Sequence, residues 1–153
     1  MPNTPAAIGK GMSVLCAAPT VNDEEKELAE SLLKAVGEVA WVDDEDDMNA
    51  VTALSGSGPA WFFSLMEAME EAGVEMGLPQ DVARKLTVNT AWGAGALARK
   101  VAKDTPPAQL RKNVTSPGGT TEAGLNVLSS YKFKDSVKDA LKQAQARSRE
   151  LSK

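Results

Sequence analysis

The residues best suited to chemistry lie in one short stretch, residues 113–121, which reads Asn-Val-Thr-Ser-Pro-Gly-Gly-Thr-Thr. The stretch carries four hydroxyl groups and no charge. Pro117 fixes its own φ and Gly118 tolerates a positive φ, so residues 116–119 are predicted to form a tight turn. An apolar-periodic helix follows, and either Thr120 or Thr121 is expected to cap it.

The start of that helix is suited to binding a small anion. The backbone amides of Gly119, Thr120 and Thr121 are expected to point off the helix N-terminus, which carries partial positive charge. The two glycines allow an anion to approach the backbone closely. The stretch therefore predicts a carboxylate or phosphate site. A proline-glycine turn that only joins two helices explains it equally well, so the loop alone leaves both interpretations open.

Composition excludes several classes of function. The chain has 153 residues, room for one domain and little more. Seventeen basic against 21 acidic residues give a net charge of −4, which argues against a nucleic-acid partner. One cysteine excludes an internal disulfide and a cysteine metal cluster, and the lack of histidine excludes Ser-His-Asp triads and histidine metal sites. No metal site is predicted.

Targeting and membrane signals are also lacking in the sequence. The longest uncharged run, residues 48–66, is interrupted by Gly56, Gly58 and Pro59 and is shorter than the about 20 apolar residues of a membrane helix. No basic segment followed by an apolar block opens the chain. We therefore expect a cytoplasmic protein without a membrane partner.

The first 43 residues are predicted to contain a strand, a helix and a second strand. The two prolines in residues 1–5 are expected to keep that segment extended. Residues 12–17 and 39–42 are typical of strands, and Asn22 or Asp23 is expected to cap the helix between them, with Gly37 ending it. Two short strands are too few for an independent sheet, so this segment is interpreted as the edge of a larger α/β layer.

From residue 44 onward only helices are predicted. Five consecutive acids, residues 43–47, suit a solvated helix start. The helix that follows is expected to be interrupted at residues 55–59 and to resume at Pro59. Residues 86–98 carry no charge, which favours burial against a partner subunit over an ordinary central bundle helix. A final helix is predicted over residues 134–151, with Lys138, Lys142 and Arg149 facing outward.

Four segments resemble the pyrroline-5-carboxylate reductase family in sequence, order and spacing. They are residues 1–6, 50–60, 76–79 and 114–125, and the last is highly specific. The resemblance covers essentially the whole chain. It implies a mainly α fold: a helical dimerisation domain like the C-terminal domain of 6-phosphogluconate dehydrogenase, over residues 44–153. Residues 1–43 would be a strand–helix–strand remnant of a Rossmann nucleotide-binding domain.

The resemblance also implies an activity and its partners. Members of the family reduce 1-pyrroline-5-carboxylate to L-proline with NADPH or NADH, in proline biosynthesis. They form homodimers through the helical domain, and the dimers often assemble into decamers. The cofactor would be bound mainly by the nucleotide-binding domain that this chain lacks.

Individual residues can be matched to the roles that the family gives them. Residues of the turn would bind the substrate carboxylate, largely through backbone amides: Ser116, Gly118, Gly119 and Thr120. Thr121 matches the threonine that hydrogen-bonds the ring nitrogen and is the candidate catalytic residue, while Asn113 and Val114 match residues that line the pocket. Glu45 matches an acid near the substrate. Thr52 and Ser55 match positions that face the nicotinamide.

The dinucleotide-binding motif of the family is missing from this sequence. No G-x-G-x-x-G follows a predicted strand, and the glycines of residues 55–59 follow a helix instead. The chain is therefore interpreted as a C-terminal piece of the enzyme. Two hypotheses remain: it is part of a working reductase, or it is a stand-alone non-catalytic helical homodimerisation module. In either case the isolated chain is expected to dimerise and to reduce nothing.

Overall fold

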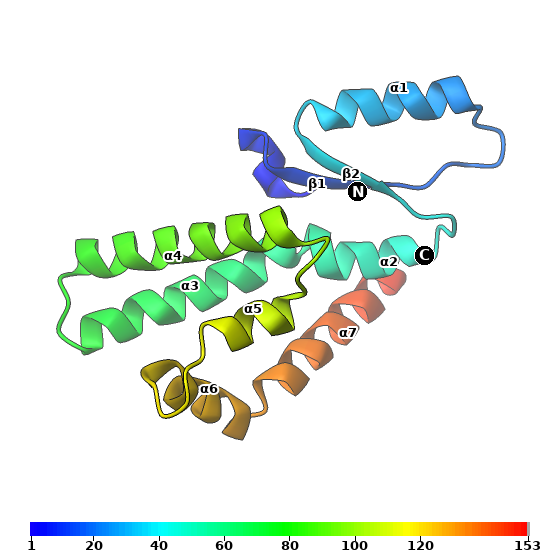
Figure 1. Cartoon of the computed structure of the whole chain (residues 1–153). Coiled ribbons are helices and arrows are strands. Elements are labelled where there is room, and N and C mark those ends of the chain that lie inside the picture. Colours follow the sequence, from blue (N-terminus) through cyan, green and yellow to red (C-terminus); the bar gives the residue numbers. More distant parts are fainter. Residues whose placement is uncertain (153) are drawn as a thin grey trace. The chain divides into compact units, whose positions relative to one another are not determined.

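The computed structural model describes residues 1–152. These residues form two compact units. The first unit contains residues 1–62 and 137–152, and the second contains residues 63–136. Helices make up most of both units (Figure 1). The predicted mainly α fold class, with a small strand segment, is confirmed.

The first unit holds the strand–helix–strand segment that the sequence predicts. Strand β1 (Gly11–Leu15) pairs in parallel with β2 (Gly37–Trp41), and helix α1 (Asp23–Lys34) makes the crossover that a parallel pair requires (Figure 1). Asn22 caps α1, because its side chain accepts from the Glu25 amide while the Glu25 carboxylate accepts from the Asn22 amide. This reciprocal pair is a capping box.

Two local predictions for this segment are wrong. Residues Thr4–Ile8 form a short 3₁₀ helix instead of an extended segment, because Pro5 sits in its first turn, where a missing N–H costs nothing. Gly37 does not end α1 but opens β2 with a φ of 156°. A Cβ on Gly37 would overlap the Gly11 carbonyl oxygen of the neighbouring strand. This position therefore requires glycine.

The predicted interruption near residues 55–59 is present, but as a π-helical turn instead of a loop. Helix α2 (Asp47–Val51) leads through this turn, Thr52–Gly56, and through Ser57 into α3 (Gly58–Glu75), one residue before the predicted start (Figure 1). Such turns insert one extra residue into a helix and are frequent at functional sites. In this one, the Ser57 amide donates to the Thr52 carbonyl at 2.7 Å.

Side chains satisfy the two carbonyl groups that the π-helical turn leaves open. The Ala53 carbonyl loses the Ser57 amide and accepts instead from Trp61 Nε1 at 3.2 Å. The Ser55 carbonyl faces the position of Pro59, which has no N–H, and it accepts from Asn3 Nδ2 at 3.2 Å. The helix therefore passes its glycines and proline without unpaired backbone acceptors at these two positions.

The second unit consists of helices. It contains the rest of α3, then α4 (Gln80–Val101), α5 (Pro107–Asn113), α6 (Thr120–Ser130) and the start of α7 (Phe133–Leu151). Helices α3 and α4 lie side by side as an antiparallel hairpin (Figure 1). Arg84 of α4 pairs with Glu70 of α3 at 2.9 Å, and this ion pair holds the pKa of the Glu70 carboxyl below its ordinary value.

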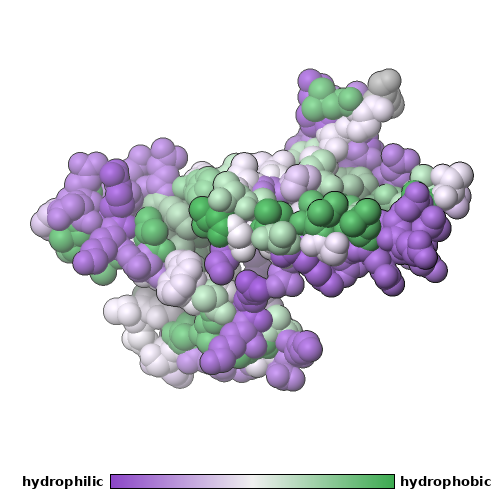
Figure 2. Space-filling model, turned by 90° about the horizontal axis from the view of Figure 1, so that it is seen from above, coloured by the Kyte–Doolittle hydropathy of each residue, from purple (hydrophilic) through white to green (hydrophobic). Residues whose placement is uncertain are grey.

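Much apolar surface of the chain is exposed. Of the described hydrophobic residues only Val14, Ala53 and Ala83 are fully buried, and hydrophobic side chains are visible at the surface in Figure 2. The uncharged part of α4 leaves Trp92 72% exposed and Leu86 54% exposed. The accessible surface is 11432 Å². A compact monomer of this mass exposes about 7,400 Å², and two separate compact bodies sharing it would expose about 9,000 Å².

No helix among residues 1–152 has both the length and the apolar character that crossing a membrane requires.

Candidate active site

The predicted tight turn before α6 is present. The Gly119 amide donates to the Ser116 carbonyl at 3.0 Å, and Gly118 has a φ of 71°. This is the geometry of a turn that needs a positive φ at its third residue. Gly119 is constrained as well, because a Cβ there would lie 2.6 Å from Ser116 Oγ. The two glycines are thus needed for different reasons. Gly118 adopts the positive φ of the turn, and Gly119 leaves room for the Ser116 side chain.

The expectation that Thr120 or Thr121 caps α6 is wrong. Gly119 is the N-cap residue, and it offers no side chain for capping. Glu122, in the first turn of α6, reaches back instead, and its Oε2 accepts from the Gly118 amide at 2.8 Å. In a capping box, the acid three residues into the helix accepts from the amide of the N-cap residue. Here Glu122 has that position but accepts from the amide of Gly118, one residue before the N-cap residue Gly119.

Three consecutive amides are open to a ligand at the head of α6. The Gly118 and Gly119 amides are used within the loop, by Glu122 and Ser116. The first bond into the helix runs from the Ala123 amide to the Gly119 carbonyl at 3.1 Å. The amides of Thr120, Thr121 and Glu122 therefore have no acceptor among the described residues. The open amides are thus displaced by one residue from the predicted set of Gly119, Thr120 and Thr121, because the Gly119 amide is used in the turn.

The residues that lead into this turn are held by local bonds. Asn113 is the last residue of α5, and its Oδ1 accepts from Gln109 Nε2 at 2.8 Å. Thr115 Oγ1 donates to the Arg111 carbonyl at 2.6 Å. Val114, between them, is 65% exposed. Val114 is therefore available to line a pocket, whereas the Asn113 amide group is engaged with its own helix.

A second group of predicted residues lies in the first unit, around a pocket of about 740 Å³. Glu45 and Thr52 both line it. The carboxylate of Glu45 is exposed and has no partner among residues 1–152. Thr52 Oγ1 donates to the Met48 carbonyl at 2.8 Å, so the hydroxyl oxygen remains able to accept. Ser55 does not line this pocket. It lies in the π-helical turn, where its Oγ accepts from Asn3 Nδ2 at 3.4 Å.

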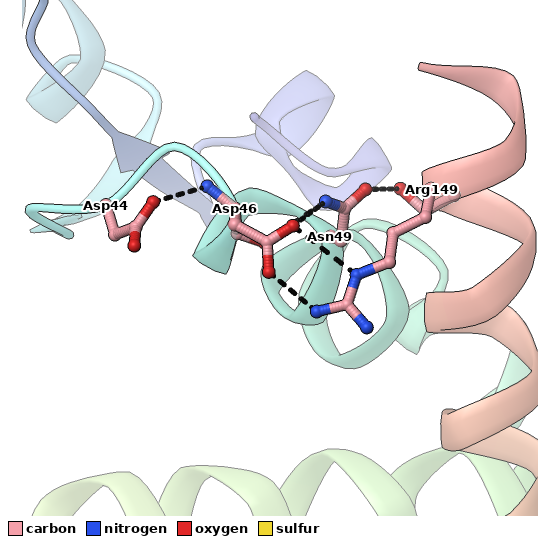
Figure 3. A network of polar contacts seen from close by, with 5 residues as sticks. Asp44, Asp46, Asn49 and Arg149 are labelled. Carbon is pink, nitrogen blue, oxygen red and sulfur yellow. Dashed lines mark hydrogen bonds and ion pairs between the residues drawn. The ribbon is translucent and has the colours of Figure 1, made fainter. Parts of the chain in front are cut away.

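Three residues that line this pocket, Asp46, Asn49 and Ser148, belong to a polar network (Figure 3). Arg149 of α7 binds Asp46 through two contacts, Nη2 to Oδ2 at 2.6 Å and Nε to Oδ1 at 3.4 Å. Asn49 Nδ2 donates to Asp46 Oδ1 at 3.2 Å, and Ser148 Oγ donates to Asn49 Oδ1 at 2.9 Å. The hydrogen bonds from Arg149 hold the pKa of the Asp46 carboxyl below its ordinary value.

Sequence reasoning missed this network. Arg149 was predicted to face solvent, yet its guanidinium turns to Asp46, 103 residues earlier in the chain. No short motif links residues so far apart. The only local signal is that Ser148 lies at helical spacing from Val137, Leu141, Ala144 and Leu151, on the face of α7 that is expected to pack on other residues.

The predicted site residues thus form two groups in different units. Glu45, Thr52 and Ser55 belong to the first unit, and residues 113–121 belong to the second. The first group offers a carboxylate and hydroxyls, and the guanidinium of Arg149, which lies beside it, is already paired with Asp46. The second group offers amide donors and hydroxyls, which suit a carboxylate.

Comparison with known proteins identifies the family. Residues 45–151 match the model of the pyrroline-5-carboxylate reductase dimerisation family. The chain belongs to the pyrroline-5-carboxylate reductase family. A relative from Pseudomonas aeruginosa, a pyrroline-5-carboxylate reductase, is 47% identical over 152 residues, covering 99% of this chain and 55% of the relative. A relative from Pisum sativum with the same name is 41% identical over 152 residues, 99% of this chain and 55% of the relative.

Solved pyrroline-5-carboxylate reductase structures share the fold. The enzyme from Coxiella burnetii superposes with a TM-score of 0.95 at 45% identity, covering 100% of this chain and 56% of that one. The enzyme from Plasmodium falciparum, solved with NADP bound, gives a TM-score of 0.91 at 33% identity and covers 100% and 62%. The chain therefore spans little more than half the length of the reductases it matches, at their C-terminal portion.

Proposed function

We propose that the full-length protein carrying this chain reduces 1-pyrroline-5-carboxylate to L-proline with NADPH or NADH. The observation that carries the proposal is the head of α6. There, three unpaired amides and the exposed Thr121 lie next to a turn that depends on two glycines, in a chain of the reductase family. A small ring bearing a carboxylate and a neighbouring nitrogen matches this arrangement.

Each group at the head of α6 then has a role. The amides of Thr120, Thr121 and Glu122 bind the substrate carboxylate, supported by the Ser116 hydroxyl. Gly118 and Gly119 shape the turn that exposes those amides. The Thr121 hydroxyl hydrogen-bonds the ring nitrogen, which makes Thr121 the proposed catalytic residue. Asn113 and Val114 form the adjoining wall of the substrate site.

The first unit is proposed to serve the reacting end of the cofactor. When bound, NADPH or NADH supplies the hydride that adds to the imine carbon. Thr52 and Ser55 face the nicotinamide, and the Glu45 carboxylate favours the positive charge of the protonated imine. As hydride adds, the π electron pair of the C=N bond moves onto nitrogen, which already carries its proton. No histidine general acid is therefore needed for this step.

We also propose that the chain forms a homodimer through its helical domain, with the domain boundary near residue 43. The support is its surface. It exposes at least about 2,400 Å² more than compact bodies of its mass would. An obligate dimer buries about 2,000–5,000 Å² in total, or about 1,000–2,500 Å² on each chain. Assembly into a decamer and a cytoplasmic location stay predictions from the family resemblance.

Two preparations test the proposal. The first is the chain alone, and the second is a fusion of the portion of the Pseudomonas aeruginosa relative that this chain does not match, followed by the chain. We expect light scattering to give twice 16.1 kDa for the chain alone. We expect the fusion, and not the chain alone, to oxidise NADPH with pyrroline-5-carboxylate. A dimeric but inactive fusion would favour the alternative, a non-catalytic dimerisation module. A monomeric chain would contradict the dimer.

A further inference from the structure

The acids of residues 43–47 do not share one role. Asp44 Oδ1 accepts from the Asp46 amide at 2.9 Å, and Asp46 is bound by Arg149 and Asn49 (Figure 3). Both side chains are used to build the start of α2. Glu45 lies between them, lines the pocket beside Thr52, and has no partner in the described part of the chain. Of the two acids that line this pocket, only Glu45 is free to act on a ligand.

Helix α2 cannot fix its own start. Its C-terminal end leads through the π-helical turn to α3, so only its first turn lacks support from the rest of the helix. Asp46 is its N-cap residue, yet the Asp46 side chain makes no capping bond, because Arg149 and Asn49 hold it instead. The orientation of this helix start therefore depends on contacts from the last turns of α7. Those contacts are the Arg149–Asp46 ion pair and the hydrogen bond from Ser148 to Asn49.

The end of α7 also forms part of the pocket wall. Ser148, Leu151 and Ser152 line the same pocket as Glu45 and Thr52. The end of α7 thus both lines the pocket and holds the start of α2 through the Arg149–Asp46 ion pair and the Ser148–Asn49 hydrogen bond. Loss of these two contacts would therefore move Glu45 relative to the pocket wall.

We propose that Arg149 is a positioning residue for Glu45. The Nε and Nη2 atoms of Arg149 bind the Asp46 carboxylate and so fix the backbone next to Glu45. The Glu45 carboxylate is thereby held in the pocket beside Thr52. This inference rests on the proposed function, which places Glu45 near the substrate. It goes beyond that function by assigning to the C-terminal helix a part in the geometry of the site.

Arg147 provides a matched control on the same helix. It has a similar side-chain exposure, 66% against 50% for Arg149, and it pairs with Glu150 at 2.7 Å within the helix. Replacing Arg147 removes one arginine charge and one ion pair without touching α2. Any general effect of charge or of helix stability should therefore appear in both substitutions.

The test uses the active fusion described above. We expect Arg149→Ala to raise the KM for pyrroline-5-carboxylate about tenfold, because displacement of a positioned group costs binding and orientation. Arg147→Ala should change it less than about twofold. Arg149→Lys should recover only part of the loss, since a lysine cannot reproduce the two-nitrogen contact. The affinity for L-proline, measured by calorimetry, should follow the same order and does not require turnover.

A double-mutant cycle separates positioning from general structural damage. If Arg149 acts through Glu45, then Arg149→Ala should have less than about a twofold further effect once Glu45→Gln is present. An undiminished effect in that background, or equal effects of the Arg149 and Arg147 substitutions, would overturn the inference while leaving the reductase function intact. An unsubstituted fusion that neither reduces pyrroline-5-carboxylate nor binds L-proline would overturn both.

Discussion

Two substitutions of Glu122 should change substrate binding in opposite directions. Glu122 Oε2 accepts from the Gly118 amide at 2.8 Å, and Gly118 holds the positive φ on which the turn depends. Glu122→Ala removes that acceptor, so the turn loosens and the amides at the head of α6 lose their alignment. Glu122→Gln keeps an oxygen acceptor but removes a negative charge beside a site for a carboxylate.

The expected sizes follow from these two terms. A hydrogen bond to a charged group contributes about 1.5–3 kcal/mol when desolvated, and about 1 kcal/mol is reasonable at this half-exposed position. Its loss in Glu122→Ala should raise the KM for pyrroline-5-carboxylate about fivefold. Two carboxylates about 6 Å apart in water repel by about 0.7 kcal/mol. Relief of that repulsion in Glu122→Gln should lower the KM about threefold.

The assay is initial-rate kinetics of the fusion at saturating NADPH, with kcat and KM fitted separately. Because the Glu122 side chain serves the turn, kcat should stay within about twofold of the unsubstituted protein. The gain from Glu122→Gln should shrink at high ionic strength, where screening weakens the repulsion. If both substitutions raise KM to the same extent, the charge argument is wrong. If neither changes it, the Gly118 contact has no part in substrate binding.

Three further predictions concern single positions. Thr121→Ala in the active fusion should lower kcat/KM about 10–1000-fold through loss of one orienting hydrogen bond, and unchanged kinetics would remove Thr121 from the mechanism. Gly37→Ala should destabilise the first unit by about 3 kcal/mol or more, because its Cβ overlaps the Gly11 carbonyl oxygen; an unchanged thermal midpoint would contradict the strand register. Trp61→Phe keeps the ring but leaves the Ala53 carbonyl without its donor, so chemical denaturation should show a loss of about 1–2 kcal/mol, and equal stability would mean that another donor replaces the indole.

Much of the fold follows from signals that act over a few residues. Asn22 and Glu25 lie three residues apart and define the start of α1 as a capping box. The turn before α6 follows from Pro117 and Gly118, whose backbone preferences are fixed by their own covalent structure. The long final helix follows from its apolar periodicity and is observed as Phe133–Leu151.

At two places competition for hydrogen bonds decided what the local pattern could not. Residues 55–59 contain the residues that most often break helices, yet the helix continues, since Asn3 supplies the donor that Pro59 lacks. Asn3 lies 52 residues from Ser55, so no local rule includes it. Thr120 and Thr121 are good capping residues, but Glu122 satisfies the loop first and Gly119 takes the N-cap position.

The sequence by itself determined the family, the mainly helical class and the tight turn that exposes the amides of α6. Backbone preferences and helical periodicity are properties of neighbouring residues, and they can be read without the fold. Tertiary structure alone decided which acid of residues 43–47 both lines the pocket and lacks a partner among the described residues. Five adjacent carboxylates are alike in sequence, and only the arrival of Arg149 from the other end of the chain commits Asp46 to structure and leaves Glu45 unpaired in the pocket.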